Sequence, residues 1–202
     1  MTLVTVRHAA ILWSACSLIA LTGAQARGLA GGAVVAGSAQ ISTGANGQSV
    51  IKQATNKAII DWRDFTVDAG EGVRFVQPGR DSVTLNRVTG GAASRIDGTI
   101  DAVGQVWLLN PNGVLIGSTG HVSAAGFLAS SRVISNADFM AGRYDFVQAS
   151  GADGAIANHG SIRVNGGYAV LAGSRGANSG LIEANLGQIA LGAGKNFTVD
   201  LG

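Results

Sequence analysis

The chain repeats itself with a period of 20 residues near its C-terminal end, and this periodicity limits the possible folds more than any other feature. A related phrase occurs upstream with one residue fewer, as GTIDA followed by GQVWL, which matches GLIEA followed by GQIAL. Repeated spacing of this kind indicates a stack of similar units rather than a single irregular core. The identical pairs under the 20-residue shift are Asn158/Asn178, Gly160/Gly180, Ile162/Ile182, Asn165/Asn185, Gly167/Gly187 and Leu171/Leu191.

Each repeat contains short stretches of alternating side chains, such as residues 162–164 and 189–191, separated by glycine and asparagine. Alternation places successive side chains on opposite faces of a β-strand, and glycine and asparagine tolerate the backbone angles of tight corners. About 20 residues suit one circuit of three short strands and three corners, and circuits stack at the inter-strand spacing of ~4.8 Å. The repeat therefore predicts an all-β chain folded as a parallel β-helix, or β-solenoid.

The composition excludes several other classes of protein. Glycine contributes 31 of the 202 residues without a three-residue period, which excludes collagen. Apolar residues make up 47% of the chain, enough to disfavour disorder. Glutamate and lysine, good formers of surface helices, are almost absent. The net charge of +2 comes from scattered arginines without a basic run, so the chain lacks the charge pattern of a nucleic-acid-binding protein.

Residues 1–26 have the features of a cleaved secretory signal peptide. Arg7 provides the basic start, and residues 9–21 form an apolar stretch that is too short to span a bilayer as a stable helix. A small-x-small pattern follows and places cleavage before residue 27, although a retained N-terminal anchor is an alternative reading. The predicted cleavage residues are Ala24, Ala26 and Arg27.

Cys16 is the only cysteine, and it lies inside the predicted signal peptide. Its removal leaves a mature chain, residues 27–202, that contains no thiol. Exported proteins often depend on disulfides, so this one must depend on burial and backbone pairing for stability. The absence of disulfides also suits a chain that crosses a membrane unfolded.

Residues 27–202 are predicted to form one solenoid domain with irregular ends. Residues 31–47 are rich in glycine, alanine and serine and are expected to form an N-terminal cap over the first open edge. Residues 131–142 break the pattern, and we expect an excursion there with a short helical turn near residues 137–140. A further strand begins at residue 197 without closing the other end, so we expect the domain to continue in a longer protein.

The tetrapeptide Asn110-Pro111-Asn112-Gly113 is the sharpest local motif. It separates the apolar stretches 106–109 and 114–116. Asparagine, proline, asparagine and glycine occupy the positions they favour in a type I turn. Taken alone, the tetrapeptide predicts a corner between two strands.

In its sequence context this motif carries a resemblance to a known family. The chain resembles the secretion domain of two-partner secretion exoproteins, which is the N-terminal region of the filamentous haemagglutinin family. The resemblance covers about residues 28–202, and its motifs occur in order along the chain. They lie at residues 60–67, 86–89, 94–98, 104–117, 126–130, 158–162 and 187–191.

The resemblance also indicates a branch of the family. One subclass carries a second signature, Asn-Pro-Asn-Leu, which this sequence lacks. In the corresponding strand region the chain has Asn86, Arg87, Val88 and Thr89. The pattern is closer to the branch of high-molecular-weight adhesins and haemopexin-binding proteins.

Membership of this family would imply a route to the cell surface of a Gram-negative bacterium. POTRA domains of an outer-membrane TpsB-type barrel would recognise the domain in the periplasm. The domain would then emerge and nucleate folding of a right-handed β-helix. The full-length protein would be an adhesin or haemagglutinin, or a haem-acquisition protein, with a role in virulence and a host glycan or protein bound by its downstream region. The resemblance implies no enzymatic activity and no cofactor, and it leaves open whether Asn110 and Asn112 contact the transporter or only hold a turn.

Two other functions remain as alternatives. One is a β-helix polysaccharide lyase or hydrolase, which would need clustered carboxylates. The other is the passenger of an autotransporter. The available carboxylates are explained as solvent-exposed residues at strand ends and corners. The sequence also has no cysteine–histidine spacing that would predict a metal site. The candidate carboxylates are Asp61, Asp64, Asp68, Asp97 and Asp101.

Three large aromatic residues, Trp62, Trp107 and Tyr168, raise the question of a sugar-binding surface. Stacked aromatic side chains on an exposed face would suit carbohydrate. Large aromatics also dominate burial in small β cores. We therefore expect these side chains to pack in the core or at an end of the solenoid.

Overall fold

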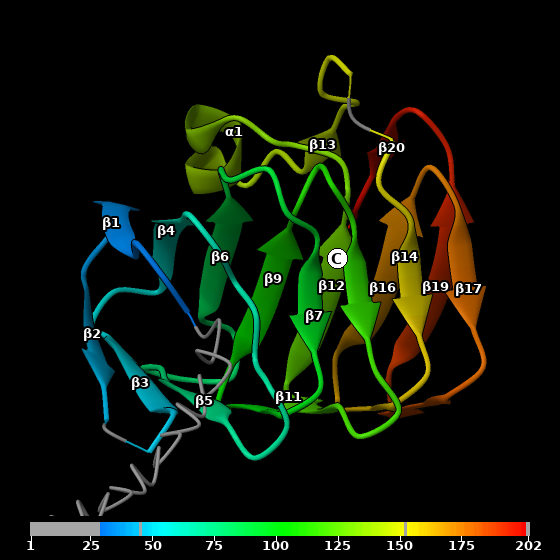
Figure 1. The fold of residues 1–202 in the computed structure, drawn as a ribbon. Coiled ribbons are helices and arrows are strands. Elements are labelled where there is room, and N and C mark those ends of the chain that lie inside the picture. The colour runs from blue at the N-terminus through cyan, green and yellow to red at the C-terminus, as the bar shows by residue number, and fades with distance from the viewer. Residues whose placement is uncertain (1–28, 45, 152, 201–202) are drawn as a thin grey trace, which may run out of the picture.

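The computed structural model describes residues 29–44, 46–151 and 153–200, which form a stack of β-strand coils (Figure 1). In this part of the chain the strands make two seven-stranded sheets, one four-stranded sheet and one two-stranded sheet. A coil is defined here as one circuit of the chain through the three larger sheets. The N-terminal end of the stack lies at one side of Figure 1 and the C-terminal coils lie at the other. The predicted parallel β-helix is confirmed.

The three larger sheets are named sheets I, II and III. Sheet I has the order β1 (Ala33–Ala36), β4 (Lys57–Trp62), β6 (Val83–Val88), β9 (Gln105–Leu109), β12 (Gly126–Ser130), β16 (Tyr168–Gly173) and β19 (Gln188–Ala193). Sheet II has the order β2 (Ala39–Thr43), β3 (Gln48–Gln53), β5 (Gly72–Val76), β8 (Thr99–Ala102), β11 (His121–Ala124), β15 (Ser161–Asn165) and β18 (Leu181–Asn185). Sheet III has the order β7 (Ser94–Ile96), β10 (Val114–Ile116), β14 (Ile156–Asn158) and β17 (Gly176–Asn178).

The sequence repeat is the stacking register of the coils. Each repeated residue within a strand pairs with its equivalent in the next strand, so that Asn158 faces Asn178 between β14 and β17. The same holds for Ile162 and Ile182 between β15 and β18. All of these strand pairs are parallel. One repeat therefore equals one coil.

Glycine recurs in the repeat because the backbone of one coil passes close to the next. A Cβ atom at Gly160 would lie 2.3 Å from the carbonyl oxygen of Gly120. A Cβ atom at Gly180 would lie 2.2 Å from the carbonyl oxygen of Gly160. Carbon and oxygen atoms cannot approach so closely without a shift of the backbone, so this column of corners requires glycine.

The interior of the solenoid is a column of apolar side chains. Inward-facing residues from successive coils are fully buried in one contiguous cluster, which includes Ile60, Phe75, Ile100, Val122, Phe127 and Ile162. Trp62 belongs to the same cluster and is 2% exposed. Each coil covers the apolar surface of its neighbours. Apolar burial and strand pairing therefore both stabilise the contacts between adjacent coils.

The N-terminal end of the stack is closed by two strands that run against the others. β1 pairs antiparallel with β4, and β2 pairs antiparallel with β3. The partly buried side chains of Leu29, Ala39 and Ile41 cover the end of the inner core. The predicted N-terminal cap is therefore confirmed.

The predicted excursion after β12 contains one short helix, α1 (Asn136–Ala141). Ser135 caps its N-terminus by accepting a hydrogen bond from the backbone N–H of Asp138, and Gly142 ends it in a left-handed conformation. The chain then forms β13 (Asp145–Phe146), which pairs antiparallel with β20 (Phe197–Thr198). These elements pack against the outer face of sheet I. In Figure 1, α1 lies above β6, and β13 and β20 lie farther towards the C-terminal coils.

The C-terminal coil has no equivalent cover in the described part of the chain. Ile189 and Leu191 of β19 continue the inward-facing row of Ala169 and Leu171. Ala169 and Leu171 are 0% and 1% exposed, whereas Ile189 and Leu191 are 48% and 55% exposed. The last coil therefore presents apolar side chains that one more coil would bury.

Gly160→Ala is expected to lower the free energy of unfolding by about 2 kcal/mol or more, because its methyl group would overlap the backbone of the preceding coil. Gly79→Ala is the matched control, since a Cβ atom there meets nothing within 4 Å, and its effect should stay within about 0.5 kcal/mol. Urea unfolding of the mature chain measures both. Equal effects of the two substitutions would contradict the close approach of the coils.

Candidate functional site

The tetrapeptide 110–113 forms the predicted corner between β9 and β10. The backbone N–H of Gly113 donates to the carbonyl oxygen of Asn110 at 2.9 Å, which closes a four-residue turn. The backbone N–H of Asn112 donates to Oδ1 of Asn110, also at 2.9 Å. The Asn110 side chain thus reinforces the turn from inside, as asparagine commonly does at the first position of a turn.

Asn110 also joins three successive coils. Its Nδ2 donates to the carbonyl oxygen of Ala92 and to Oγ of Ser94 in the preceding coil, both at 3.0 Å. Its backbone N–H donates at 2.9 Å to the carbonyl oxygen of Ser130 in the following coil. The residue is fully buried, so its side chain is satisfied by the protein rather than by solvent.

Asn112 is exposed but makes a similar contact to the preceding coil. Its Nδ2 donates to the carbonyl oxygen of Gly90 at 2.9 Å. On the other side of the corner, the backbone N–H of Gly154 donates to the carbonyl oxygen of Pro111 at 3.1 Å. The corner is therefore packed between the coils before and after it.

Gly113 allows this packing. Its φ angle is +109°, and a Cβ atom there would lie 2.6 Å from the carbonyl oxygen of Ala155. Both the backbone conformation and the space exclude a larger residue. All four residues of the tetrapeptide thus contribute to one interlocked corner.

The second motif lies on the adjacent coil, at the end of β6. Asn86 is fully buried and accepts a hydrogen bond at 3.0 Å from Nε1 of Trp62. Its Nδ2 donates at 3.2 Å to the carbonyl oxygen of Trp107 in the next coil. Oγ1 of Thr89 donates to the carbonyl oxygen of Trp62 at 3.0 Å. Asn86 and Thr89 therefore hold neighbouring strands of sheet I together.

Arg87 and Val88 face opposite sides of sheet I. Val88 is buried in the inner core. The guanidinium group of Arg87 donates two hydrogen bonds to the carboxylate of Asp61, both at 2.9 Å, and a third at 2.8 Å to Oδ1 of Asn136 on α1. Arg87 is also the register partner of Leu109, which places the second motif beside the start of the asparagine corner.

The large aromatic residues lie where core packing was expected. Trp62 packs edge-on against Phe65 inside the solenoid. Trp107 is fully buried beneath the outer layer, and its Nε1 donates to the hydroxyl oxygen of Tyr168 at 2.6 Å. The hydroxyl of Tyr168 donates in turn to Oε1 of Gln105 at 2.5 Å. Trp62 and Trp107 are therefore buried and cannot form part of an exposed sugar-binding surface.

The candidate carboxylates do not come together. Asp61 is paired with Arg87, and Asp97 is paired with Arg95. Oδ1 of Asp64 accepts a hydrogen bond from the hydroxyl of Thr66 at 2.7 Å. Across residues 29–44, 46–151 and 153–200, no three His, Cys, Asp or Glu side chains are grouped so that they could hold a metal ion.

Sequence reasoning missed a buried polar network at the corner between sheets II and I. Nε2 of Gln77 donates at 3.0 Å to Oγ1 of Thr84 and at 3.0 Å to the carbonyl oxygen of Gln105. Oγ1 of Thr84 donates at 2.5 Å to Oε1 of Gln53. The available signal in the sequence was a polar residue, Thr84, within the otherwise apolar start of the strand 83–88.

The predicted cleavage residues Ala24, Ala26 and Arg27 lie outside the described residues. Among those that are described, no helix has the length and hydrophobicity needed to cross a membrane.

Together these features define a class of protein: a parallel β-solenoid with an N-terminal cap, an outer layer on sheet I and an interlocked asparagine corner. Comparison with known proteins gives the same result. The family model described as the TPS secretion domain matches residues 26–202. The chain belongs to this two-partner secretion domain family.

Two relatives from Haemophilus influenzae are similar over most of the chain. A heme/hemopexin-binding protein is 38% identical over 179 residues, which cover 85% of this chain and 20% of the relative. The crystal structure of the HMW1 secretion domain superimposes with a TM-score of 0.82 at 38% identity, covering 86% of this chain and 47% of that one. The chain thus spans about a fifth of the curated relative's length. Both matches agree with the branch that the sequence motifs indicated.

Asn110→Ala is expected to lower the free energy of unfolding by about 2–3 kcal/mol, because it leaves buried donors and acceptors in two coils without partners. Asn112→Ala should cost about 1 kcal/mol or less, since its exposed side chain contacts only the carbonyl oxygen of Gly90 and, at 3.4 Å, Oδ1 of Asn110. Urea unfolding gives both values. The reverse order of effects would contradict the burial of Asn110.

Burial raises the pKa of the Tyr168 phenol above its ordinary value. A raised pKa means that the folded state holds this proton more tightly than the unfolded state. The protonated phenol of Tyr168 therefore makes its full contribution to the free energy of unfolding below pH ~10, the ordinary pKa of tyrosine. That contribution is lost as the pH rises above this value.

The mature chain is therefore expected to lose stability in alkaline solution, and Tyr168→Phe should reduce that loss while lowering stability at neutral pH. Urea unfolding at neutral pH and at about pH 10.5 measures the difference. An identical alkaline loss in the wild type and in the variant would exclude Tyr168 as the cause.

Proposed function

We propose that this chain is the N-terminal secretion domain of a longer exported exoprotein, and that a TpsB-type outer-membrane transporter recognises it in the periplasm of a Gram-negative bacterium. The observation that carries this proposal is the family match over residues 26–202, together with the fold shared with the HMW1 secretion domain. In this proposal residues 1–26 direct the chain through the inner membrane and are removed. The POTRA domains of the transporter then bind the unfolded domain.

Growth from a nucleus explains why such a domain stands at the front of an exported chain. Each coil needs a neighbour to bury its faces, so the first coils are the costly step and later coils add to them. The antiparallel cap and the interlocked corner supply a defined starting structure. A coil that folds outside the cell resists return through the pore, which gives the transport a direction.

The exposed last coil supports the continuation of the solenoid. Ile189 and Leu191 are about half exposed although they continue a fully buried row. A following coil would bury them and pair with the free edge of β19. We propose that the solenoid continues into the downstream region of the full-length protein.

The cargo function is proposed from the relatives alone. The similar protein of Haemophilus influenzae is named for binding heme and hemopexin, and HMW1 provides the matching secretion domain. A surface protein that acquires haem or adheres to host glycans or proteins fits these relationships. The lyase or hydrolase alternative gains no support, because the described carboxylates are paired or dispersed.

Secretion with and without the partner tests the proposal. A chain with its signal peptide should reach the medium when a cognate TpsB-type transporter is co-expressed, and should remain in the periplasm when it is not. Asn110→Ala should lower the secreted yield several-fold through loss of the corner, Asn112→Ala should lower it less, and Gln40→Ala, at an exposed position of β2, should leave it unchanged. Secretion that does not depend on the transporter would overturn the proposal.

The stability of the purified variants identifies the cause of any export defect. If export falls in proportion to the free energy of unfolding, the asparagines act by holding the corner. A loss of export in Asn112→Ala at unchanged stability would instead assign Asn112 a direct contact with the transporter, because its side chain lies at the surface.

A further inference from the structure

Two segments that are distant in the sequence join on the outer face of sheet I. They are residues 131–151 and residues 194–200, and we call them together the latch. β13 and β20 pair between them, and the rings of Phe146 and Phe197 stack with their centroids 4.5 Å apart. The backbone N–H of Val199 donates to the carbonyl oxygen of Tyr144 at 3.1 Å. The latch is therefore complete only when both segments are folded.

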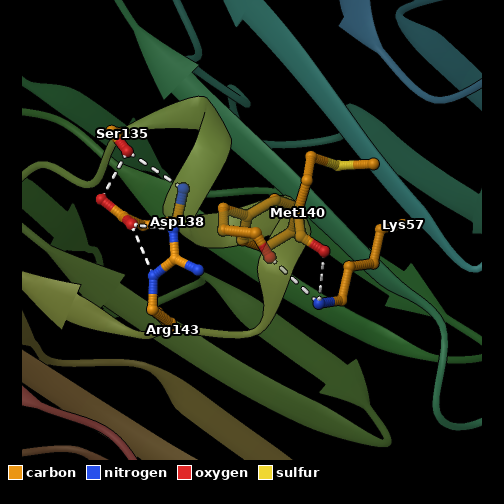
Figure 2. Close-up of polar contacts among 6 residues, drawn as sticks. Lys57, Ser135, Asp138, Met140 and Arg143 are labelled. Atoms are coloured by element: carbon orange, nitrogen blue, oxygen red, sulfur yellow. Dashed lines mark hydrogen bonds and ion pairs between the residues drawn. The ribbon is translucent and has the colours of Figure 1, made fainter.

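At one end the latch is attached to β4, the first parallel strand of sheet I. Nζ of Lys57 donates to the carbonyl oxygens of Phe139 at 3.0 Å and Met140 at 3.3 Å, at the C-terminus of α1 (Figure 2). The same ammonium group lies 5.1 Å from the ring centroid of Tyr144. A cation at the C-terminal end of a helix is favourable because the carbonyl groups there carry partial negative charge.

The helix itself is held by a local polar cluster on its other side. The hydroxyl of Ser135 and the guanidinium group of Arg143 both contact the carboxylate of Asp138 (Figure 2). These hydrogen bonds lower the pKa of Asp138, with the Ser135 hydroxyl as the larger cause. The cluster fixes the helix, so that the two carbonyl groups stay directed at Lys57.

At the other end the latch is continuous with the last coil, because residue 194 follows β19 directly, and two hydrogen bonds inside the latch join its two segments. Arg132 is 1% exposed, and its Nε donates at 2.7 Å to the carbonyl oxygen of Gly194, directly after β19. The backbone N–H of Gln148 donates to Oδ1 of Asn196 at 3.3 Å. Beneath the middle of the latch lies Trp107, with ring centroids of Tyr144 and Phe146 within 4.8 Å and 5.6 Å.

A solenoid without such a feature is held together only by contacts between neighbouring coils. Its ends then open independently of each other, because no interaction joins coils that are far apart. The latch contacts β4 and is continuous in the chain with β19, and these two strands lie at opposite ends of the parallel part of sheet I.

We propose that the latch couples the first and the last coil energetically, so that the domain opens as one cooperative unit instead of fraying from its C-terminal end. This inference does not depend on the proposed function. It predicts that a substitution in the first coil changes the opening of the last coil, and that the reverse is also true, because a coupling free energy is reciprocal.

Hydrogen exchange of the mature chain, measured residue by residue, tests the coupling. Lys57→Met keeps the length of the side chain but removes the cation. It should raise exchange rates in α1 and also in β18 and β19 by about tenfold, as expected when a cation is lost from a helix terminus. Lys52→Met is the matched control, because Lys52 lies on β3 of the same coil with its side chain exposed. This control should leave β18 and β19 within about twofold of the wild type.

Phe197→Ala tests the same coupling from the other end. It removes the stacked ring over Phe146 and should raise exchange in α1 and β4 as well as in β19. If each substitution speeds exchange only in its own coil, the latch is a local cover and the proposal is wrong. The same conclusion follows if Lys52→Met affects the last coil as strongly as Lys57→Met does.

Discussion

Close contact between the backbones of successive coils is the constraint on which the rest of the structure depends. Glycine at the stacked corners lets a carbonyl oxygen of one coil approach where any side chain would overlap it. Strand pairing in register then follows, and it aligns the apolar side chains into one inner column. This stacking explains the repeat in the sequence, because the residues that recur are those that contact their own equivalents in the next coil.

The asparagine corner shows how the same principle applies to polar residues. Asn110 is buried and connects the coils on both sides, and Asn86 connects two strands of the adjacent coils in a similar way. A buried asparagine side chain destabilises the fold unless both its NH2 group and its carbonyl oxygen are hydrogen-bonded. Each of these asparagines therefore favours the one register of the stack in which its partners are in place. The hydrogen bonds that these asparagines make between coils thus give a structural reason for both sequence motifs. In the proposed secretion route, in which the chain folds outside the cell, such unambiguous registration is an advantage.

The sequence predicted the local and periodic features well. The 20-residue repeat predicted the coils, the glycine-rich start predicted the cap, and the break in pattern at residues 131–142 predicted the excursion with its helical turn. The latch was not predictable, because β13 and β20 have two residues each and their pairing joins positions more than 50 residues apart. The burial of Arg132 was equally hidden, since an arginine outside a periodic strand suggests an exposed position.

Deletion of one whole coil tests the stacking most directly. Removal of residues 161–180 joins Gly160 to Leu181, so that the chain passes from one equivalent corner to the next and keeps the register of the remaining strands of sheets I, II and III. The shortened chain should keep a β-rich circular dichroism spectrum and a single unfolding transition at reduced stability. Removal of residues 161–170, half a coil, should abolish both. If the two deletions behave alike, the coils are not the structural unit and the account is wrong.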